Sequence, residues 1–436
     1  MNVLVIGSGG REHAIVWKIR QSPKCEKIYC APGNAGIAQI AELVPIKAND
    51  IDSLLNFASQ HAIDLTIVGP EQPLTEGIVD RFEERGLKIF GPTRAASMLE
   101  GSKVFAKSFM QRFGIPTSVF KTFGVDQRFD AERFINESPV PIVVKASGLA
   151  AGKGVVVCET KEEALNAVTM MVEQKAFGDA GMEIVIEEYL AGEEASIFAI
   201  SDGKEFVTLT PAQDHKRIFD NDLGKNTGGM GAYAPAPAMN AEVIEAVNQS
   251  IITPTLAGMA KEGSPFKGCL YVGLMLTATG PMVIEYNCRF GDPETQAVLP
   301  LLADDLLELM AGAADGKLKS TANLNAGTAV CVVISSGGYP DKYETGKRII
   351  GLENARCEQD VMVFHAGTRQ SGDDIVTDGG RVLGITAIGP SGELEQTVDK
   401  AYRAVERITF DGAYYRSDIG RKGIERLRQL HSLEKS

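Results

Sequence analysis

Three polar side chains alternate at the end of an apolar run, at Glu285, Asn287 and Arg289. If that run forms a strand, alternation places all three side chains on one face. A carboxylate and an amide oxygen suit Mg²⁺, and an arginine can bind a phosphate or a carboxylate through two parallel hydrogen bonds. A surface strand with a salt bridge would show the same pattern. Asp292 and Glu294 follow, however, and such crowding of carboxylates around one arginine favours a binding site.

A glycine-rich segment, residues 148–155, lies between two predicted strands. Lys145 precedes the segment and Lys153 lies within it. It is not a Walker A loop, because only three residues separate Gly148 from Gly152 and a glycine follows the second lysine. A loop between two strands can form a flap whose backbone N–H groups close over phosphates. A plain hairpin turn is the alternative, but such a turn requires neither lysine.

The loop GSGGREH, residues 7–13, follows the first apolar strand and contains Arg11. It lacks the dinucleotide fingerprint, since Glu12 stands where the third glycine belongs and no acidic residue follows the second strand. This disfavours an NAD-dependent oxidoreductase. The N–H groups and the dipole of a helix N-terminus still favour a phosphate there. A strand-to-helix turn without a ligand is the alternative.

Weaker patterns involve lysine and glutamate pairs. Lys103 and Lys107 share one face of a predicted helix, while 187–188 end one predicted strand and 193–194 begin the next. A solvated helix face and an exposed hairpin explain these patterns equally well. Nucleophilic hydrolysis is poorly supported, because no G-x-S-x-G motif is present and the five histidines are far apart.

Residues 226–238 are rich in glycine and show no secondary-structure pattern, so we expect a binding loop there. His215 precedes this stretch in the segment QDHKR and is the one histidine of functional interest. A single helix is expected over about 241–262.

The elements that must position these residues divide the chain into three parts. Residues 1–102 alternate short apolar strands with helices, which is typical of a parallel sheet covered on both faces. Residues 103–325 contain the lysines, the flap and the Glu–Asn–Arg segment, and residues 326–436 are β-rich with a helix. We therefore expect an α/β and α+β multidomain fold, with ligands at the carboxyl ends of the parallel strands.

The composition excludes several classes of protein. With 436 residues, 44% of them hydrophobic, the chain can form a large core and is not mainly disordered. A formal net charge of −13 disfavours a nucleic-acid partner. Seven cysteines without C-x-x-C spacing indicate neither a disulfide framework nor a zinc site. No apolar run is long enough for a membrane span, and we expect a cytoplasmic protein.

Many segments, in order and over nearly the whole chain, resemble the phosphoribosylamine–glycine ligase family of the ATP-grasp superfamily. They are VLVIGSGGREHA (3–14), APGNAG, TIVGPE, KIFGPT, EGSK, GLAAGKGV, IEEYLAGEEAS, QDHKR, NTGGMGAYAP, EYNCRFGDPETQ, GGYP, FHAGT and DIGRKGIERL (418–427).

The resemblance implies an ATP-grasp domain at 103–325 with a lid subdomain at about 118–192, between an N-terminal substrate domain at 1–102 and a small C-terminal domain at 326–436. The implied reaction joins glycine to 5-phosphoribosylamine with ATP, through glycyl phosphate, in de novo purine synthesis. Mg²⁺ or Mn²⁺ would be the cofactor, and a monomer without nucleic-acid or membrane partners is expected. Another ATP-grasp carboxylate–amine ligase is the nearest alternative; the intact Glu–Asn–Arg set disfavours a non-catalytic nucleotide sensor.

The resemblance also implies roles for individual residues. Glu285 and Asn287 would bind the metal, and Arg289 would steady the acyl phosphate. Lys145 matches the second phosphate lysine of the superfamily and Lys103 the first, with Lys107 as the alternative on the same helix face. The remaining ATP contacts would come from the flap and from the adenine and ribose segment, at Gly148, Gly152, Lys153, Gly154, Glu187, Glu188, Leu190 and Glu194.

Substrate contacts are expected in two groups. The phosphoribosyl group would meet Gly9, Gly10, Arg11, Asn34 and Glu71, and glycine and the amine would meet Asp214, Asn226, Thr227 and Asp292. The expected catalytic residues are Arg289, Lys145, Asp292 and Asp214.

Two positions depart from the family pattern. Ser147 replaces the usual acidic residue before the flap, which bears on flap geometry or local charge. The preceding strand offers Gly273 and apolar residues where many ATP-grasp enzymes have a second metal carboxylate, so a second ion would need Asp292 or water.

Overall fold

A parallel sheet forms from the first hundred residues of the computed structural model, which describes residues 1–149, 154–172, 182–319 and 321–433. The strand order is β3–β2–β1–β4–β5. The strands are β1 (Asn2–Gly7), β2 (Lys27–Pro32), β3 (Glu42–Leu43), β4 (Leu65–Val68) and β5 (Ile89–Phe90). The helices are α1 (Gly10–Ile19), α2 (Ile51–Gln60), α3 (Glu71–Thr75), α4 (Ile78–Glu84) and α5 (Met98–Gly101). Strands β1 and β4 are almost wholly apolar because they are buried, as is typical of a parallel sheet.

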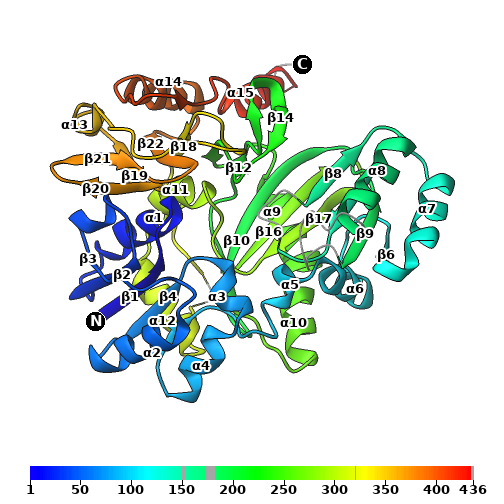
Figure 1. The fold of residues 1–436 in the computed structure, drawn as a ribbon, viewed down its shortest axis with the longest axis horizontal. Coiled ribbons are helices and arrows are strands. Elements are labelled where there is room, and N and C mark those ends of the chain that lie inside the picture. The colour runs from blue at the N-terminus through cyan, green and yellow to red at the C-terminus, as the bar shows by residue number, and fades with distance from the viewer. Residues whose placement is uncertain (150–153, 173–181, 320, 434–436) are drawn as a thin grey trace.

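A second sheet is antiparallel, has the order β6–β9–β7–β8, and lies at the right of Figure 1. It follows helix α6 (Lys103–Phe113) and comprises β6 (Phe120–Gly124), β7 (Ile142–Ala146), β8 (Val155–Cys158) and β9 (Glu183–Glu188). Helices α7 (Arg128–Glu137) and α8 (Lys161–Val172) bury their apolar side chains against it. The flap lies between β7 and β8, and its residues 150–153 are outside the described part of the chain.

The central sheet is antiparallel, in the order β11–β10–β16–β17. It comprises β10 (Glu193–Asp202), β11 (Phe206–Thr208), β16 (Lys267–Thr277) and β17 (Gly280–Asn287). Helices α11 (Glu294–Val298) and α12 (Leu306–Ala314) follow it, and α12 packs against β10 and β16. The Glu–Asn–Arg segment begins at the end of β17, and this end of the strand lies near the middle of the molecule (Figure 1).

The expectation of one continuous helix over 241–262 was wrong for residues 248–252, in the middle of this segment. The structure has α9 (Ala241–Val247), a π-helical segment at Asn248–Ile252 and α10 (Thr253–Lys261). Pro254 lies in the first turn of α10 and has no N–H to donate, which interrupts the regular α-helical hydrogen bonds.

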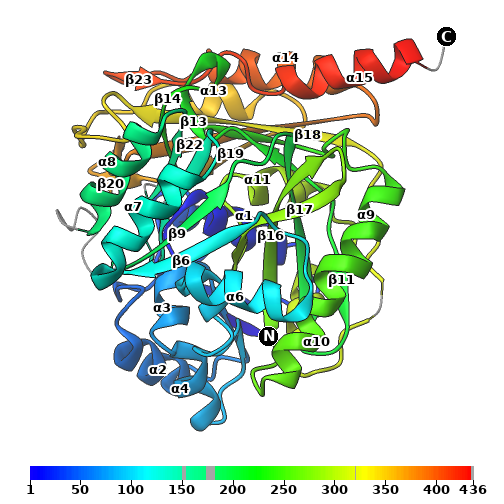
Figure 2. The same ribbon diagram turned by 90° about the vertical axis from the view of Figure 1, so that its right-hand side faces the viewer.

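The last sheet joins strands from two distant parts of the chain, in the order β12–β15–β18–β22–β19, with β23 beside β18. It comprises β12 (Gln213–Asp214), β15 (Gly231–Ala234), β18 (Thr328–Ser336), β19 (Val361–His365), β22 (Arg381–Gly389) and β23 (Ala413–Tyr414). Helices α14 (Leu394–Val405) and α15 (Arg421–Leu433) lie over it at the top of Figures 1 and 2. Among the described residues, no helix is both long enough and apolar enough to span a membrane.

The expectation that residues 226–238 lack secondary structure was therefore wrong for β15. Its sequence, GAYA, has little strand propensity of its own, and the strand forms because it pairs with β12 on one side and β18 on the other. Two short hairpins complete the fold, β13 (Arg217–Phe219) with β14 (Leu223–Asn226), and β20 (Thr368–Ser371) with β21 (Asp374–Thr377).

Candidate active site

A cleft of about 1380 Å³ is lined by residues from every part of the chain. Most residues predicted from the sequence line it: Arg11, Glu71, Lys103, Lys107, Lys145, Gly154, Glu187, Glu188, Leu190, Glu194, Asp214, Asn226, Thr227, Glu285, Asn287, Arg289 and Asp292. Gly9, Gly10, Asn34 and Gly148 are not among the lining residues. Gly152 and Lys153 lie outside the described residues.

Two lysines share one buried carboxylate at the wall formed by α6, β7 and β9. Lys145 Nζ lies 2.5 Å from one oxygen of Glu187, and Lys107 Nζ lies 2.6 Å from the other. Burial opposes ionisation of Glu187, but the two ammonium groups outweigh it and lower the pKa of the carboxyl to about 2. Burial lowers the pKa of Lys107 to about 8, although Glu187 opposes this. The side chain of Glu187 is therefore a counter-ion to both lysines, a role that the sequence did not indicate.

Lys103 lies beside the flap. Its ammonium group donates to the carbonyl oxygen of Gly148 at 3.2 Å, and burial lowers its pKa. Ser147 connects the flap to the start of α6, because its Oγ accepts from the N–H of Val104 at 3.2 Å and its carbonyl accepts from the N–H of Lys103 at 2.8 Å. The serine that departs from the family pattern thus satisfies N–H groups in the first turn of a helix, where an acceptor is required.

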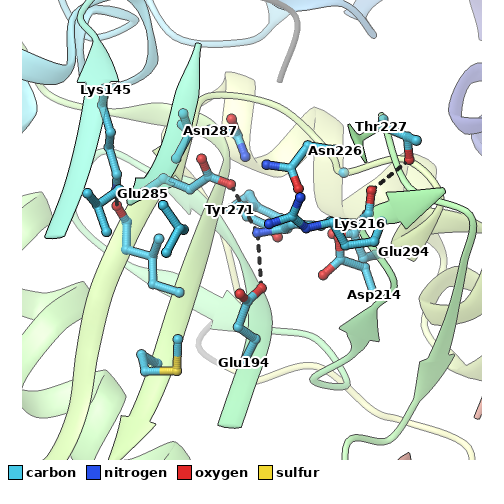
Figure 3. A pocket seen from close by; sticks show the side chains of 18 of the residues that line it. Lys145, Glu194, Asp214, Lys216, Asn226, Thr227, Tyr271, Glu285, Asn287 and Glu294 are labelled. Carbon is cyan, nitrogen blue, oxygen red and sulfur yellow. Dashed lines mark hydrogen bonds and ion pairs between the residues drawn. The ribbon is translucent and has the colours of Figure 1, made fainter. Parts of the chain in front are cut away.

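Glu285 and Asn287 present oxygen atoms at the end of β17 (Figure 3). The unpredicted Lys216 lies between two carboxylates, 3.5 Å from Glu285 and 3.3 Å from Glu194. Burial favours a raised pKa for Glu285, but Lys216, Lys145 and Lys103 outweigh it, and the net shift of the pKa is downward. An ionised carboxylate beside an amide oxygen fits a hard divalent cation. Within the described part of the chain, no three carboxylate, histidine or cysteine side chains form a metal cage.

The guanidinium group of Arg289 forms ion pairs with two carboxylates. Its Nε lies 3.1 Å from Glu71, and its Nη2 lies 2.9 Å from the unpredicted Glu100. Glu100 also accepts from the N–H of Cys288 at 2.7 Å. Burial opposes ionisation of Glu71, but Arg289 and Arg11 lower the pKa of its carboxyl to about 2. Arg289 is thus fixed in orientation before any substrate binds.

The helix N-terminus at Gly9 is already occupied by the chain's own carboxylate. Glu12 accepts from the N–H of Gly9 at 2.6 Å and from Nε of Arg11 at 2.5 Å. The sequence predicted exposed N–H groups for a phosphate here; the N–H of Gly9 is instead taken by Glu12, and a contact of this loop with a phosphoribosyl group remains a prediction. Arg11 still lines the cleft and donates to the carbonyl of Phe290 at 3.1 Å.

Asn34 is 4% exposed, and its amide hydrogen bonds are made within the protein. It donates to the carbonyls of Ser8 and His365, both at 2.8 Å, and accepts from the N–H groups of Gly36 and Ile37. It therefore ties the loop after β2 to the C-terminal sheet, and its contact with a phosphoribosyl group remains a prediction.

A carboxyl pair lies on the side of the cleft opposite Lys145, where Figure 3 shows Asp214 and Glu294 next to each other. Glu294 is 4% exposed and accepts from the hydroxyl of Tyr271. Burial raises the pKa of Asp214 to about 8, with Lys216 opposing and Glu294 adding to the shift. Neither carboxyl has a salt-bridge partner among the described residues, so this side of the cleft suits a cationic group of a ligand.

The sequence pointed to His215, but the residues of QDHKR that line the cleft are Gln213, Asp214, Lys216 and Arg217. His215 is 1% exposed, lies 3.4 Å from the carbonyl of Gly231 and does not line the cleft. The motif QDHKR thus lies at the cleft, although the histidine singled out in it does not reach it.

Models of one protein family match most of the chain. The model described as "Phosphoribosylglycinamide synthetase, ATP-grasp (A) domain" matches residues 101–295, and those of the N and C domains match residues 1–100 and 329–422. A phosphoribosylamine–glycine ligase of Chlorobaculum tepidum is 51% identical over 97% of this chain and 100% of that protein.

A solved structure of a protein with the same name as that relative is also similar to this chain. The phosphoribosylamine–glycine ligase of Thermotoga maritima has a TM-score of 0.83 at 34% identity, covering 96% of this chain and 100% of that one. A biotin carboxylase of Campylobacter jejuni, crystallised with an ATP analogue, has a TM-score of 0.73 at 16% identity over 95% of this chain and 92% of that one, which is a likeness of fold alone. The multidomain α/β and α+β ATP-grasp fold predicted from the sequence is confirmed.

Proposed function

The chain belongs to the phosphoribosylglycinamide synthetase family, and we propose that its central cleft is where ATP, glycine and 5-phosphoribosylamine meet. The chain is a ligase of purine biosynthesis. It joins glycine to 5-phosphoribosylamine, converts ATP to ADP and phosphate, and forms glycinamide ribonucleotide. One observation supports the location most directly: Lys145 of β7, Glu285 of β17 and Arg289, two residues after β17, line one cleft.

The reaction proceeds through glycyl phosphate in two displacements. A carboxylate oxygen of glycine first attacks the γ-phosphorus of ATP, and ADP leaves. The amine nitrogen of phosphoribosylamine then attacks the carbonyl carbon, the bond from that carbon to the phosphate oxygen breaks, and the nitrogen releases a proton. Positioning and neutralisation of charge supply most of the catalysis in such phosphoryl transfers.

For the nucleotide, we assign the phosphate contacts to Lys145 and Lys103. Lys107 is a poorer candidate because its ammonium group donates to Thr117 and Ser118, at 2.7 and 2.6 Å, in addition to its ion pair with Glu187. The segment Glu187–Leu190 would meet adenine through its backbone, and Glu194 would meet the ribose. Support for this assignment is that these residues line the same cleft as the lysines.

For the metal, we assign Mg²⁺ or Mn²⁺ to Glu285 and Asn287. Such an ion would neutralise charge on the phosphate oxygens and take further ligands from them. Two protein ligands suffice for that, because Mg²⁺ in phosphate sites is usually held by one or two carboxylates, substrate oxygens and water.

For the other substrates, we assign the acyl phosphate to Arg289 and the phosphoribosyl group to the region of Arg11 and Glu71. Asp214 would take part in binding the amino groups, with Asn226, Thr227 and Asp292 nearby. Arg289 supports this assignment because its contacts with Glu71 and Glu100 leave it preorganised, which reduces the cost of ordering it on binding.

We also propose that the chain acts as a monomer in the cytoplasm on small molecules, with domain limits at residues 102 and 325. Support for a monomer is that residues from all three parts of one chain line the cleft.

The decisive assay measures ADP release with glycine and freshly generated 5-phosphoribosylamine, with Mg²⁺ present. We expect release to require all three reactants and to be much slower when alanine or serine replaces glycine. A different carboxylate–amine ligase would release ADP with another amino acid or another amine. ADP release that does not change when phosphoribosylamine is omitted would contradict the proposal.

A further inference from the structure

Arg381, the first residue of β22, extends from the C-terminal sheet into the cleft. We propose that it is a positioning residue for the ligase reaction, whose guanidinium group joins the two segments that carry substrate-facing side chains. One segment contains Asn226 and Thr227, and the other contains Asp292. The inference rests on the function proposed above and assigns a role to a residue that no motif indicated.

The guanidinium group of Arg381 makes four contacts with these segments. Its Nη1 donates to the carbonyl oxygens of Gly228 and Gly229, at 2.6 and 3.3 Å, and to that of Asp292 at 2.6 Å. Its Nη2 lies 3.2 Å from the carboxylate of Asp292, whose other oxygen accepts from Gln296 at 2.8 Å. One side chain therefore sets the distance between two loops and orients the carboxylate of Asp292.

Close packing reinforces these contacts. A Cβ atom at Gly228 would lie 2.9 Å from Cζ of Arg381, so the guanidinium group rests against this glycine. A Cβ at Gly229 would lie 2.4 Å from Cδ of Pro293. The N–H of Gly228 also donates to the hydroxyl of Tyr339 at 2.9 Å. The loop is thus enclosed by Arg381, Pro293 and Tyr339, and it has little room to shift.

A series of contacts connects this loop to the part of the cleft where we propose that the metal binds. Thr227 donates its N–H and its hydroxyl to the carbonyl oxygen of Lys216, at 2.8 and 2.9 Å. The ammonium group of Lys216 in turn lies between Glu194 and Glu285 (Figure 3). Thr227 therefore holds the backbone of Lys216, while Glu194 and Glu285 separately hold its ammonium group.

A lysine could not replace Arg381 in this arrangement. The guanidinium group is planar and presents a fixed fork of donors, whereas an ammonium group is a single point of charge on a flexible stem. Three carbonyl oxygens and a carboxylate are reached here by one fork.

The test compares Arg381→Gln and Arg381→Lys with the unmodified full-length enzyme. Both variants should lower kcat/KM for glycine and for phosphoribosylamine by between about tenfold and 10²-fold, the effect of misplacing substrates by about an ångström. KM for ATP should stay within about twofold, since the phosphate lysines lie on other elements. Arg369→Gln is the matched control, because this arginine is half-exposed, pairs with the half-exposed Asp378 and is not among the residues that line the cleft.

A second arm separates positioning from a loss of folding. Arg381→Ala should recover part of its activity when guanidinium or methylguanidinium ion is added, at a concentration that leaves the thermal unfolding of the wild type unchanged. In a double-mutant cycle with Gly228→Ala, which displaces the guanidinium group by steric contact, the two changes should be clearly less than additive.

Two results would overturn the proposal. One is a pair of Arg381 variants that unfold at lower temperature but keep the KM values for glycine and phosphoribosylamine. The other is an equal rise in KM for all three substrates, which indicates general distortion. Failure of the wild type itself to release ADP with glycine and phosphoribosylamine would instead contradict the proposed function, so the two failures are distinguishable.

Discussion

The Oε1 atom of Glu187 lies 2.5 Å from the ammonium nitrogen of Lys145, and both side chains are 5% exposed. The second oxygen of the same carboxylate holds Lys107. A buried charge of this kind is tolerated only when it is paired, so Glu187 compensates the charge of Lys145 and orients its ammonium group.

Replacement of Glu187 by glutamine should destabilise the protein and weaken ATP binding. Removal of one partner of a buried ion pair costs about 3–5 kcal/mol, because the remaining ammonium groups are left uncompensated. Urea unfolding would measure the loss of stability, and KM for ATP should rise in parallel. Glu183→Gln is the matched control, because Glu183 is exposed on the same strand and is not among the residues that line the cleft. An unchanged unfolding midpoint for Glu187→Gln would show that the pair does not form in solution.

Replacement of Glu285 by alanine should abolish Mg²⁺-dependent ADP release while the fold survives. The carboxylate is the only charged member of the Glu–Asn pair, and its loss also leaves Lys216 with one carboxylate neighbour fewer. ADP release measured over a range of Mg²⁺ concentrations would test this, with circular dichroism to confirm folding. The wild type treated with a chelator should lose activity and regain it with Mg²⁺ or Mn²⁺. Near-normal Mg²⁺-dependent turnover of Glu285→Ala would exclude the metal assignment.

Asp214→Asn should raise KM for glycine far more than KM for ATP, since a neutral amide cannot compensate an ammonium group. The pKa of Asp214 is raised to about 8 by burial, so a cationic ligand must bind the fraction that is ionised. KM for glycine should therefore fall as the pH rises from 6 towards 8, by up to about tenfold per pH unit. Asp373→Asn, an exposed carboxyl in the β20–β21 hairpin, is the control. A flat pH profile in the wild type would count against this role.

Stability should decline on mild acidification because of two buried histidines at the contact of α1 with β19. Nδ1 of His13 accepts from the N–H of His365 at 2.8 Å, which requires an unprotonated nitrogen. Burial lowers the pKa of both rings from 6.5 to about 3. The unfolded chain takes up these protons near pH 6.5 and the folded chain does not. Stability is therefore complete above pH 6.5 and is lost as the pH falls, by about 1.4 kcal/mol per histidine per pH unit.

Urea unfolding between pH 7.5 and 5 would measure this slope. His13→Asn keeps an oxygen acceptor close to the position of Nδ1 and removes one titrating group, so its slope should be shallower. His61→Asn removes an exposed histidine that stacks on Phe57 and should leave the slope as in the wild type. Equal slopes for His13→Asn and the wild type would contradict the assignment.

Local pattern alone was enough to predict the elements that carry the site. The runs VLVI (3–6) and LTIV (65–68) are short, apolar and followed by glycine, so they identify buried parallel strands whose ends meet at one edge. Alternation likewise indicated that Glu285, Asn287 and Arg289 would lie together, because a strand repeats every two residues whatever surrounds it. The irregular segment 248–252 was missed, since its π-helical form is decided by one proline and by packing.

The amino-acid sequence by itself determined which chemical groups are available and which local elements bear them, because propensity and periodicity act over a few residues. Only the tertiary structure decided their partners. Glu187 became the counter-ion of Lys107, Lys216 rather than His215 entered the cleft, and Arg381 met Gly228 across 153 positions of the chain. No short-range pattern encodes such pairings, since they arise only when the sheets have packed and buried charges must find an opposite charge or a hydrogen-bond acceptor nearby.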